Sequence, residues 1–332
     1  MSISYDKFAG CLLGQCIGDA VGFPVEGHTG AICTEYLQEH FEPLWKSGKS
    51  KIEFLFGQYT DDSQMARELL ASLSDHPQFD PHDYIERLLP LFQSRTIVGP
   101  GLACMFAIKQ IEAGVPWEEA GSPPPKAGNG TAMRTAPVGM CYCNYPETII
   151  KIARIQGRIT HQDLRCDAGS IAIAGAVALA LQGKCEPDEF CKTLAGWMSC
   201  AHKEFAAYVE GLPQYLDMPP EVAVKWMSRV GMDPGMGDSW PGISPFVIGT
   251  VLWSLYAFLR SPDDYYTSVW TAIAVGGDVD TTGAITGAIS GAYNGKAALA
   301  QHVLDKLHDH GEWKLKDLEK LCRKAYNVFY NG

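Results

Sequence analysis

Apolar residues recur along most of the chain at the three- and four-residue spacing of an amphipathic helix. In the segment 59–73 (YTDDSQMARELLASL), Met65, Leu69, Leu70 and Leu73 fall on one face. The same pattern fills segments 149–155, 167–181, 187–201, 221–230, 246–259, 265–274 and 315–329. Alternating strand patterns are hard to find, and the connectors carry Gly and Pro. The pattern predicts an all-α fold in a single compact domain over residues 1–332.

Small residues are frequent inside the predicted helices. They include Gly14, Gly18 and the Ala-rich and Gly-rich segments 172–180 and 284–292. Glycine in a helix interior costs about 1 kcal/mol relative to alanine. We therefore expect close helix contacts, or the geometry of a site, to compensate for this cost.

The composition is that of a soluble globular protein, with 46% hydrophobic and 20% charged residues. The formal net charge of -11 argues against nucleic acids and anionic membranes as main partners, and it suits a protein that holds divalent cations. The longest apolar runs, 170–181 and 246–259, fall short of a bilayer span. They predict buried helices.

The 11 cysteines are scattered along the chain. Cys141 and Cys143 form a C-x-C pair, but no second pair stands at the spacing of a zinc site. The opening MSISYDKFAG lacks a basic region followed by an apolar stretch. We expect reduced cysteines in the core of a cytoplasmic, monomeric protein.

Asp61 and Asp62 stand side by side where the helical pattern of segment 59–73 begins. An acidic side chain near a helix N-terminus gains roughly 0.3–1 kcal/mol from the helix dipole, and Thr60 or Asp61 can cap the helix. Taken alone, the doublet is explained equally well as a cap and as part of a functional site.

A second acidic cluster lies in the segment 274–295 (AVGGDVDTTGAITGAISGAYNG). Asp278 and Asp280 occupy a Gly-rich turn that is followed by Thr281 and a further helix. Alternate residues of an extended turn can direct their carboxylates toward a common centre, and the preceding glycines allow unusual backbone conformations. Four carboxylates without a metal would repel one another, whereas Mg²⁺ prefers oxygen ligands.

Three motifs resemble those of one known family. They are T-D-D-S-x-M from Thr60, G-N-G-x-x-M-R from Gly128 and G-G-D-x-D-T-T-G-A from Gly276. In this order they resemble the ADP-ribosylglycohydrolase family, which includes the glycohydrolase that reactivates dinitrogenase reductase and the ADP-ribosyl-arginine and ADP-ribosyl-serine hydrolases. The resemblance extends from Gly10 to about Gly295. It implies an all-α domain with two Mg²⁺ ions in a cleft, where Mn²⁺ can substitute.

The resemblance also implies the ligands of the two ions. Ser63 and Val279 stand where the family often has threonine, but neither is a ligand position. The implied metal ligands are Thr60, Asp61, Asp62, Asp278, Asp280 and Thr281.

The implied catalytic residues are Asp61, Asp62 and Glu26, of which one aspartate orients or deprotonates the attacking water and Glu26 is the other candidate for proton transfer. The sequence does not rank them. The G-N-G loop is expected to receive the diphosphate, and His161 to lie near the bound ADP-ribose. The implied substrate-binding residues are Gly128, Asn129, Gly130, Thr131, Met133 and His161.

Neighbouring residues have structural alternatives. Met133 is expected to pack in the core, and Arg134 either to contact a phosphate or to form a salt bridge. Asp19 is expected to hydrogen-bond to a nearby helix. The segment 296–332 is helical and amphipathic in pattern and matches no chemical motif.

The implied reaction is Mg²⁺-dependent hydrolysis of the glycosidic bond between ADP-ribose and a modified protein side chain, with arginine preferred. The partners are then the ADP-ribosylated protein and the released ADP-ribose. The alternatives are an ADP-ribosyl-serine or O-acyl-ADP-ribose hydrolase, and a non-catalytic ADP-ribose-binding or crystallin-like member of the family. A metal-independent glycosidase with paired carboxylates is a further alternative.

Overall fold

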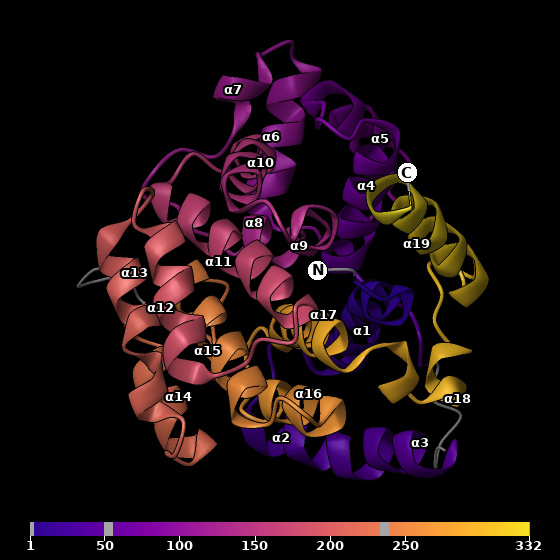
Figure 1. Cartoon of the computed structure of the whole chain (residues 1–332), viewed down its shortest axis with the longest axis vertical. Helices are drawn as coiled ribbons and strands as arrows, with labels where there is room; N and C mark the ends of the chain where they lie inside the picture. Colours follow the sequence, from indigo (N-terminus) through magenta and orange to yellow (C-terminus); the bar gives the residue numbers. More distant parts are fainter. Residues whose placement is uncertain (1–2, 50–55, 233–238, 332) are drawn as a thin grey trace.

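The computed structural model describes residues 3–49, 56–232 and 239–331 of the chain. Helices account for the regular secondary structure of these residues, and the only β-type pairings within them are isolated bridges. The prediction of an all-α, single-domain fold is therefore confirmed (Figure 1).

The helices follow one another through short connections. In the first half of the chain they are α1 (Tyr5–Gly22), α2 (Gly30–Tyr36), α3 (Glu42–Ser47), α4 (Asp61–Asp75), α5 (Pro81–Gln93), α6 (Leu102–Glu112), α7 (Trp117–Ala120), α8 (Gly130–Met133), α9 (Ala136–Tyr142) and α10 (Pro146–Arg158). In the second half they are α11 (Leu164–Leu181), α12 (Pro187–Met198), α13 (Lys203–Glu210), α14 (Pro220–Met227), α15 (Val247–Arg260), α16 (Tyr265–Ile273), α17 (Val279–Asn294), α18 (Gln301–Leu304) and α19 (Leu315–Tyr330).

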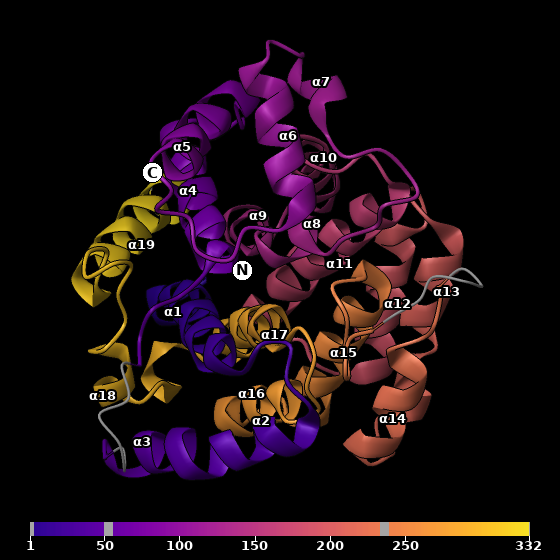
Figure 2. The ribbon, with the colours of Figure 1, turned by 180° about the vertical axis from the view of Figure 1, so that it is seen from behind.

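Two helices from opposite ends of the chain form the centre of the fold. α1 and α17 lie side by side in both views, with α4 and α19 to one side and α11 and α15 to the other (Figures 1 and 2). Almost every residue of α1, α11, α15 and α17 is buried, so these helices show little amphipathic pattern. The outer helices, such as α10 and α19, keep one polar face.

The contact between α1 and α17 depends on glycines of both helices. A Cβ added at Gly14 would lie 2.4 Å from the carbonyl oxygen of Gly287, and one added at Gly18 would lie 2.0 Å from that of Gly283. Both separations are far shorter than van der Waals contact, so only glycine permits this approach of the two backbones. The same holds for Gly10, Gly22 and Gly291. The expectation that close helix contacts compensate for the glycines is confirmed.

Two helices are long and apolar enough to cross a bilayer by length and composition alone, which the sequence analysis did not recognise. They span Tyr5–Val25 and Leu164–Leu181. In each, 89% of the apolar window is buried inside the fold, as is typical of core helices in a soluble protein. The cysteines are also mostly interior, since all except Cys185 and Cys200 are buried, and all are unpaired.

The glycine contact generates a stability prediction. We expect Gly14→Ala to lower the free energy of unfolding by about 1–3 kcal/mol, because the added methyl group forces two packed backbones apart. Thermal or urea unfolding measures the change. Gly196→Ala in α12 is the matched control, because nothing lies within 4 Å of its added Cβ. Alanine there should be neutral or stabilising. Equal unfolding curves for Gly14→Ala and the wild type would contradict the packing argument.

Candidate metal centre

The first acidic set lies at the N-terminus of α4. Thr60 is the N-cap residue, and Asp61 and Asp62 occupy the first turn, as the sequence predicted. A carboxylate of α1 fixes this turn from outside: Asp19 accepts hydrogen bonds from the backbone N–H groups of Thr60 (3.0 Å) and Ser63 (3.0 Å) and from the Thr60 hydroxyl (2.9 Å). Asp19 therefore has the structural hydrogen-bonding role that the sequence indicated, and it satisfies the open N–H groups of the helix end.

The second acidic set lies at the N-terminus of α17. Asp278 is the N-cap residue, and the helix already includes Asp280 and Thr281 in its first turn. The sequence analysis placed the whole set in a turn before the helix, which is wrong: the helix begins at Val279. Both acidic sets thus occupy the same position relative to a helix, where the positive end of the dipole stabilises negative charge.

Glu26 reaches the second set through a pairing of two loops. The N–H of Gly27 donates to the carbonyl of Gly277 (2.8 Å), and the N–H of Gly277 donates to the carbonyl of His28 (3.0 Å). Gly277 has a φ of 95°, in the left-handed region that favours glycine. Glu26 is exposed, and one of its carboxylate oxygens lies close to Asp278.

The two acidic sets meet in space although more than two hundred residues separate them. The Thr281 hydroxyl lies 3.4 Å from Oδ2 of Asp62, with which the Thr60 hydroxyl also makes a hydrogen bond of 3.1 Å. The other oxygen of Asp62, Oδ1, is buried and has no hydrogen-bond partner among the described residues. A buried carboxylate oxygen without a donor is costly, and a cation is the natural partner for it.

The chemistry of these side chains fits a hard divalent cation. One carboxylate oxygen each from Glu26, Asp278 and Asp280 lies within 4.8 Å of the others. Mg²⁺ and Ca²⁺ bind such oxygen ligands, whereas softer metals favour nitrogen or sulfur. Together with the unpartnered Oδ1 of Asp62, this group forms a candidate metal centre between α4, α17 and the loop after α1.

Burial and mutual repulsion oppose ionisation of the cluster. Burial raises the pKa of Asp61, Asp62, Asp278 and Asp280, and the charges of neighbouring carboxylates raise it further for Asp61, Asp62 and Asp280. Glu26 has a raised pKa because of partial burial and the charge of Asp278. Burial raises the pKa of Asp19 to about 7, and hydrogen bonds from Ser63 and Thr60 limit the increase.

The G-N-G loop is tied directly to the second acidic set. Asn129 donates from Nδ2 to Oδ2 of Asp278 (2.5 Å) and to the Thr250 hydroxyl (3.1 Å). Its backbone N–H donates to the carbonyl of Pro245, so the loop runs beside the segment before α15. The sequence analysis assigned Asn129 to the substrate and missed this contact, because no spacing rule links an asparagine to a carboxylate 149 residues away.

His161 lies behind the G-N-G loop. A Cβ at Gly128 would lie 3.1 Å from its Nε2, and one at Gly130 would lie 2.9 Å from its Cε1, so the glycines make room for the ring. The ring is 2% exposed, and Nδ1 lies 2.8 Å from the Thr160 hydroxyl. Burial, assisted by the positive charge of Arg134, lowers the pKa of His161 to about 3, so the imidazole is neutral at physiological pH.

The remaining residues of this motif face the protein interior. The Thr131 hydroxyl donates to the carbonyl of Cys166 (2.9 Å), and Met133 is buried, as expected for a core residue. Arg134 is fully buried and donates to neutral groups, among them the carbonyl of Gly130 and the side chain of Gln156. Arg134 is thus structural, without the expected salt bridge. Contact of the ligand with the predicted substrate-binding residues stays a prediction.

The sequence analysis also missed the loop that forms one wall of the site. The carbonyl of Val98 accepts a hydrogen bond from the N–H of Asp61 (2.8 Å), and the N–H of Gly101 bonds to the Asp61 carboxylate. A Cβ at Gly99 would lie 3.7 Å from Oδ1 of Asp61. The run of Gly and Pro in the segment 99–101 was the available signal, since it predicts a loop but not its contacts.

The fold and the site define an all-helical protein with a buried carboxylate cluster suited to divalent metal ions. A family model described as ADP-ribosylglycohydrolase matches residues 1–332. The chain belongs to the ADP-ribosylglycohydrolase family.

Several known proteins resemble the chain along nearly its full length. ADP-ribosylhydrolase ARH3 of Xenopus tropicalis is 28% identical, with 99% of both chains covered. The ADP-ribosyl-[dinitrogen reductase] glycohydrolase of Rhodospirillum rubrum is 25% identical over 85% of this chain and 83% of its own. A solved structure titled "ADP-ribosylglycohydrolase-related protein complex" superposes with a TM-score of 0.69 at 27% identity and covers 98% of both chains.

The electrostatics of the cluster predict a pH dependence that Mg²⁺ removes. The unfolded chain loses its carboxyl protons near pH 4, but the raised native pKa values mean that the native state holds protons to higher pH. Metal-free protein should therefore lose stability as the pH rises from about 4 through 7, the window set by Asp19. Mg²⁺ at one hundred times its dissociation constant should add about 2.7 kcal/mol. Thermal unfolding at pH 5.5 and pH 8, with and without Mg²⁺, measures both effects.

Asp278→Asn provides the decisive comparison. It removes one repelling carboxylate, so the metal-free variant should be less sensitive to pH than the wild type, and Mg²⁺ should stabilise it less. Asp217→Asn removes the same formal charge at an exposed position and serves as the matched control. Identical pH and Mg²⁺ responses in the Asp278 variant and in the wild type would show that Asp278 is not part of a metal site.

Proposed function

We propose that this protein hydrolyses the glycosidic bond between ADP-ribose and a modified protein side chain in a Mg²⁺-dependent reaction. The observation that supports the proposal most strongly is the meeting of the two acidic sets through Asp62 and Thr281, beside the Glu26, Asp278 and Asp280 carboxylates. The family membership points to the same activity. We propose that two ions bind, one mainly to each acidic set.

The surroundings of the cluster suit an ADP-ribose group. The G-N-G loop adjoins the cluster through the bond from Asn129 to Asp278, so a ligand on the loop lies next to the metal centre. Gly128 is half-buried, and a loop of this kind can offer backbone N–H groups to a diphosphate. Glu26 is exposed at the edge of the cluster, where it can contact a ribose.

Bound Mg²⁺ would supply a Lewis acid that orients ribose hydroxyls and lowers the pKa of a water molecule. The water oxygen bonds to C1″ of the distal ribose as the bond from C1″ to the side-chain nitrogen or oxygen breaks, through an oxocarbenium-like transition state. One proton leaves the water, and the departing side chain gains one. Asp61, Asp62 and Glu26 are the groups within this site that can accept the proton. Asn129 and Thr281 hold the acceptor carboxylates of Asp278 and Asp62 in place.

The side chain that carries the ADP-ribose defines the finer specificity. The sequence analysis favoured arginine, and this preference remains our proposal. The relatives include proteins named ADP-ribosylhydrolase ARH3 and a dinitrogen reductase glycohydrolase, so serine-linked and O-acyl substrates are direct competitors in any assay.

The activity is tested with defined peptides that carry ADP-ribose on arginine or on serine. We expect the wild type to release free ADP-ribose with Mg²⁺ and to lose this activity in chelator. Glu26→Gln should lower kcat about 10²–10⁴-fold, the usual contribution of a general acid or base. Mg²⁺ affinity, measured by calorimetry, should change much less.

Three results would contradict parts of this proposal. Full activity in chelator would favour a metal-independent glycosidase with paired carboxylates. Binding of ADP-ribose without release from any peptide would favour a non-catalytic member of the family. An equal loss of Mg²⁺ affinity and turnover in Glu26→Gln would make Glu26 a metal ligand and not the proton-transfer group.

A further inference from the structure

The loop 96–101 contacts a metal-ligand candidate but has little support of its own. It touches Asp61 at the backbone through Val98 and at the carboxylate through Gly101. This loop joins α5 to α6 and lies partly in solvent. Its position must therefore be fixed by groups behind it.

Gln64 fixes the loop from within α4. Its Oε1 accepts the N–H of Val98 (2.9 Å), and its Nε2 donates to the carbonyl of Thr96 (2.9 Å). The side chain is completely buried and lies one helical turn after Asp61. One amide therefore clamps both ends of the 96–98 segment, and Val98 in turn holds the backbone of Asp61.

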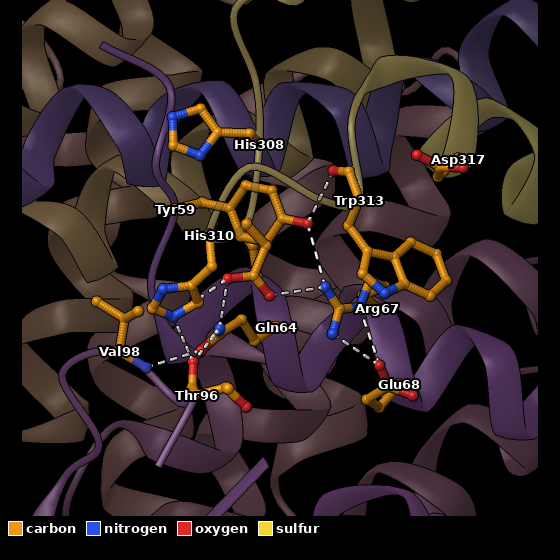
Figure 3. Close-up of polar contacts among 12 residues, drawn as sticks. Tyr59, Gln64, Arg67, Glu68, Thr96, Val98, His308, His310, Trp313 and Asp317 are labelled. Atoms are coloured by element: carbon orange, nitrogen blue, oxygen red, sulfur yellow. Dashed lines mark hydrogen bonds and ion pairs between the residues drawn. The ribbon is translucent and has the colours of Figure 1, made fainter. Parts of the chain in front are cut away.

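The C-terminal segment 308–313 fixes Gln64 and the loop from the other side (Figure 3). Oδ1 of Asp309 accepts a second bond from Nε2 of Gln64 (2.8 Å). Nε2 of His310 donates to the same Thr96 carbonyl (2.7 Å). A segment that matched no chemical motif in the sequence thus contacts both the clamp and the loop.

A buried cation holds this C-terminal segment against α4. Arg67 is 2% exposed and forms an ion pair between Nη1 and Oδ2 of Asp309 (2.9 Å). It also pairs with Glu68, and its guanidinium carbon lies 4.4 Å from the centre of the Trp313 ring (Figure 3). Removing one member of a buried ion pair is costly, so segment 308–313 has one favoured position on α4.

We infer that Gln64, supported by the segment 308–313, is a positioning residue for Asp61 that acts through the loop 96–101. Gln64 and His310 lie outside the cluster and hold the loop, and the loop holds the backbone and the carboxylate of Asp61. Partners that orient metal ligands typically change metal affinity by about 10–100-fold when mutated. The inference about activity rests on the proposed function, whereas the inference about the loop and the metal does not.

Gln64→Leu tests the inference, because leucine keeps the size of the side chain and removes both bonds to the loop. We expect amide hydrogen exchange in residues 96–101 of the metal-free protein to become about tenfold faster or more, since loss of a clamp lowers local stability. The Mg²⁺ dissociation constant, measured by calorimetry with the metal alone, should rise about tenfold. In the hydrolysis assay, the Mg²⁺ requirement should rise, and kcat at saturating Mg²⁺ should fall less.

The matched control is Gln182→Leu, which removes an amide bond to the carbonyl of Cys143 at the end of α11. It should leave the exchange of the loop and the Mg²⁺ affinity unchanged. His310→Ala is a second variant, which tests the same loop if Gln64→Leu does not fold. Its ring is 49% exposed, so the variant should fold, and exchange at Thr96 should still quicken.

Unchanged exchange and unchanged Mg²⁺ affinity in Gln64→Leu and in His310→Ala would overturn the inference and leave the network a purely structural role. If the wild type hydrolyses no ADP-ribosylated peptide, the proposed function fails. The exchange and Mg²⁺ measurements still decide the positioning role in that case.

Discussion

The close contact between α1 and α17 is the constraint on which the rest of the structure depends. Glycines at Gly10, Gly14 and Gly18 let the two backbones approach to distances that no side chain allows. This approach places the end of α1 beside the start of α17. The Glu26 loop then pairs with the turn that precedes Asp278, and the second acidic set acquires its third carboxylate. The high glycine content of these helices is thus a requirement of the site as well as of the core.

α1 also connects the site to the other segments that form it. Asp19 accepts the open N–H groups at the start of α4, and Gln15 donates to the carbonyls of Asp62 and Met133. One central helix therefore touches α4, α17 and the region after the G-N-G loop. The result is a group of carboxylates held closer together than their charges favour, with Oδ1 of Asp62 lacking a partner among the described residues. Such an arrangement gives up stability in the metal-free state for strong cation binding.

The sequence predicted the helices and the composition of the site well, because helical spacing and short motifs are local properties. The α4 cap, the acidic doublet and the second cluster follow from a few neighbouring residues. The start of α17 at Val279 was missed, because Asp278 can cap a helix or stand in an extended turn with the same neighbours. The contacts of Asn129 with Asp278 and of Gln64 with Val98 join residues far apart in sequence, so no local pattern indicates them. The family motifs compensated in part, since they named residues without showing how they touch.

Anomalous diffraction from crystals soaked in Mn²⁺ tests the central claim most directly, because Mn²⁺ favours the same oxygen ligands as Mg²⁺ and its signal locates the ion without ambiguity. The account predicts strong peaks within coordination distance of Asp62 from one chain segment and of Asp278 or Asp280 from the other. Peaks that contact only one segment, or no peak in this cleft at saturating Mn²⁺, would contradict it.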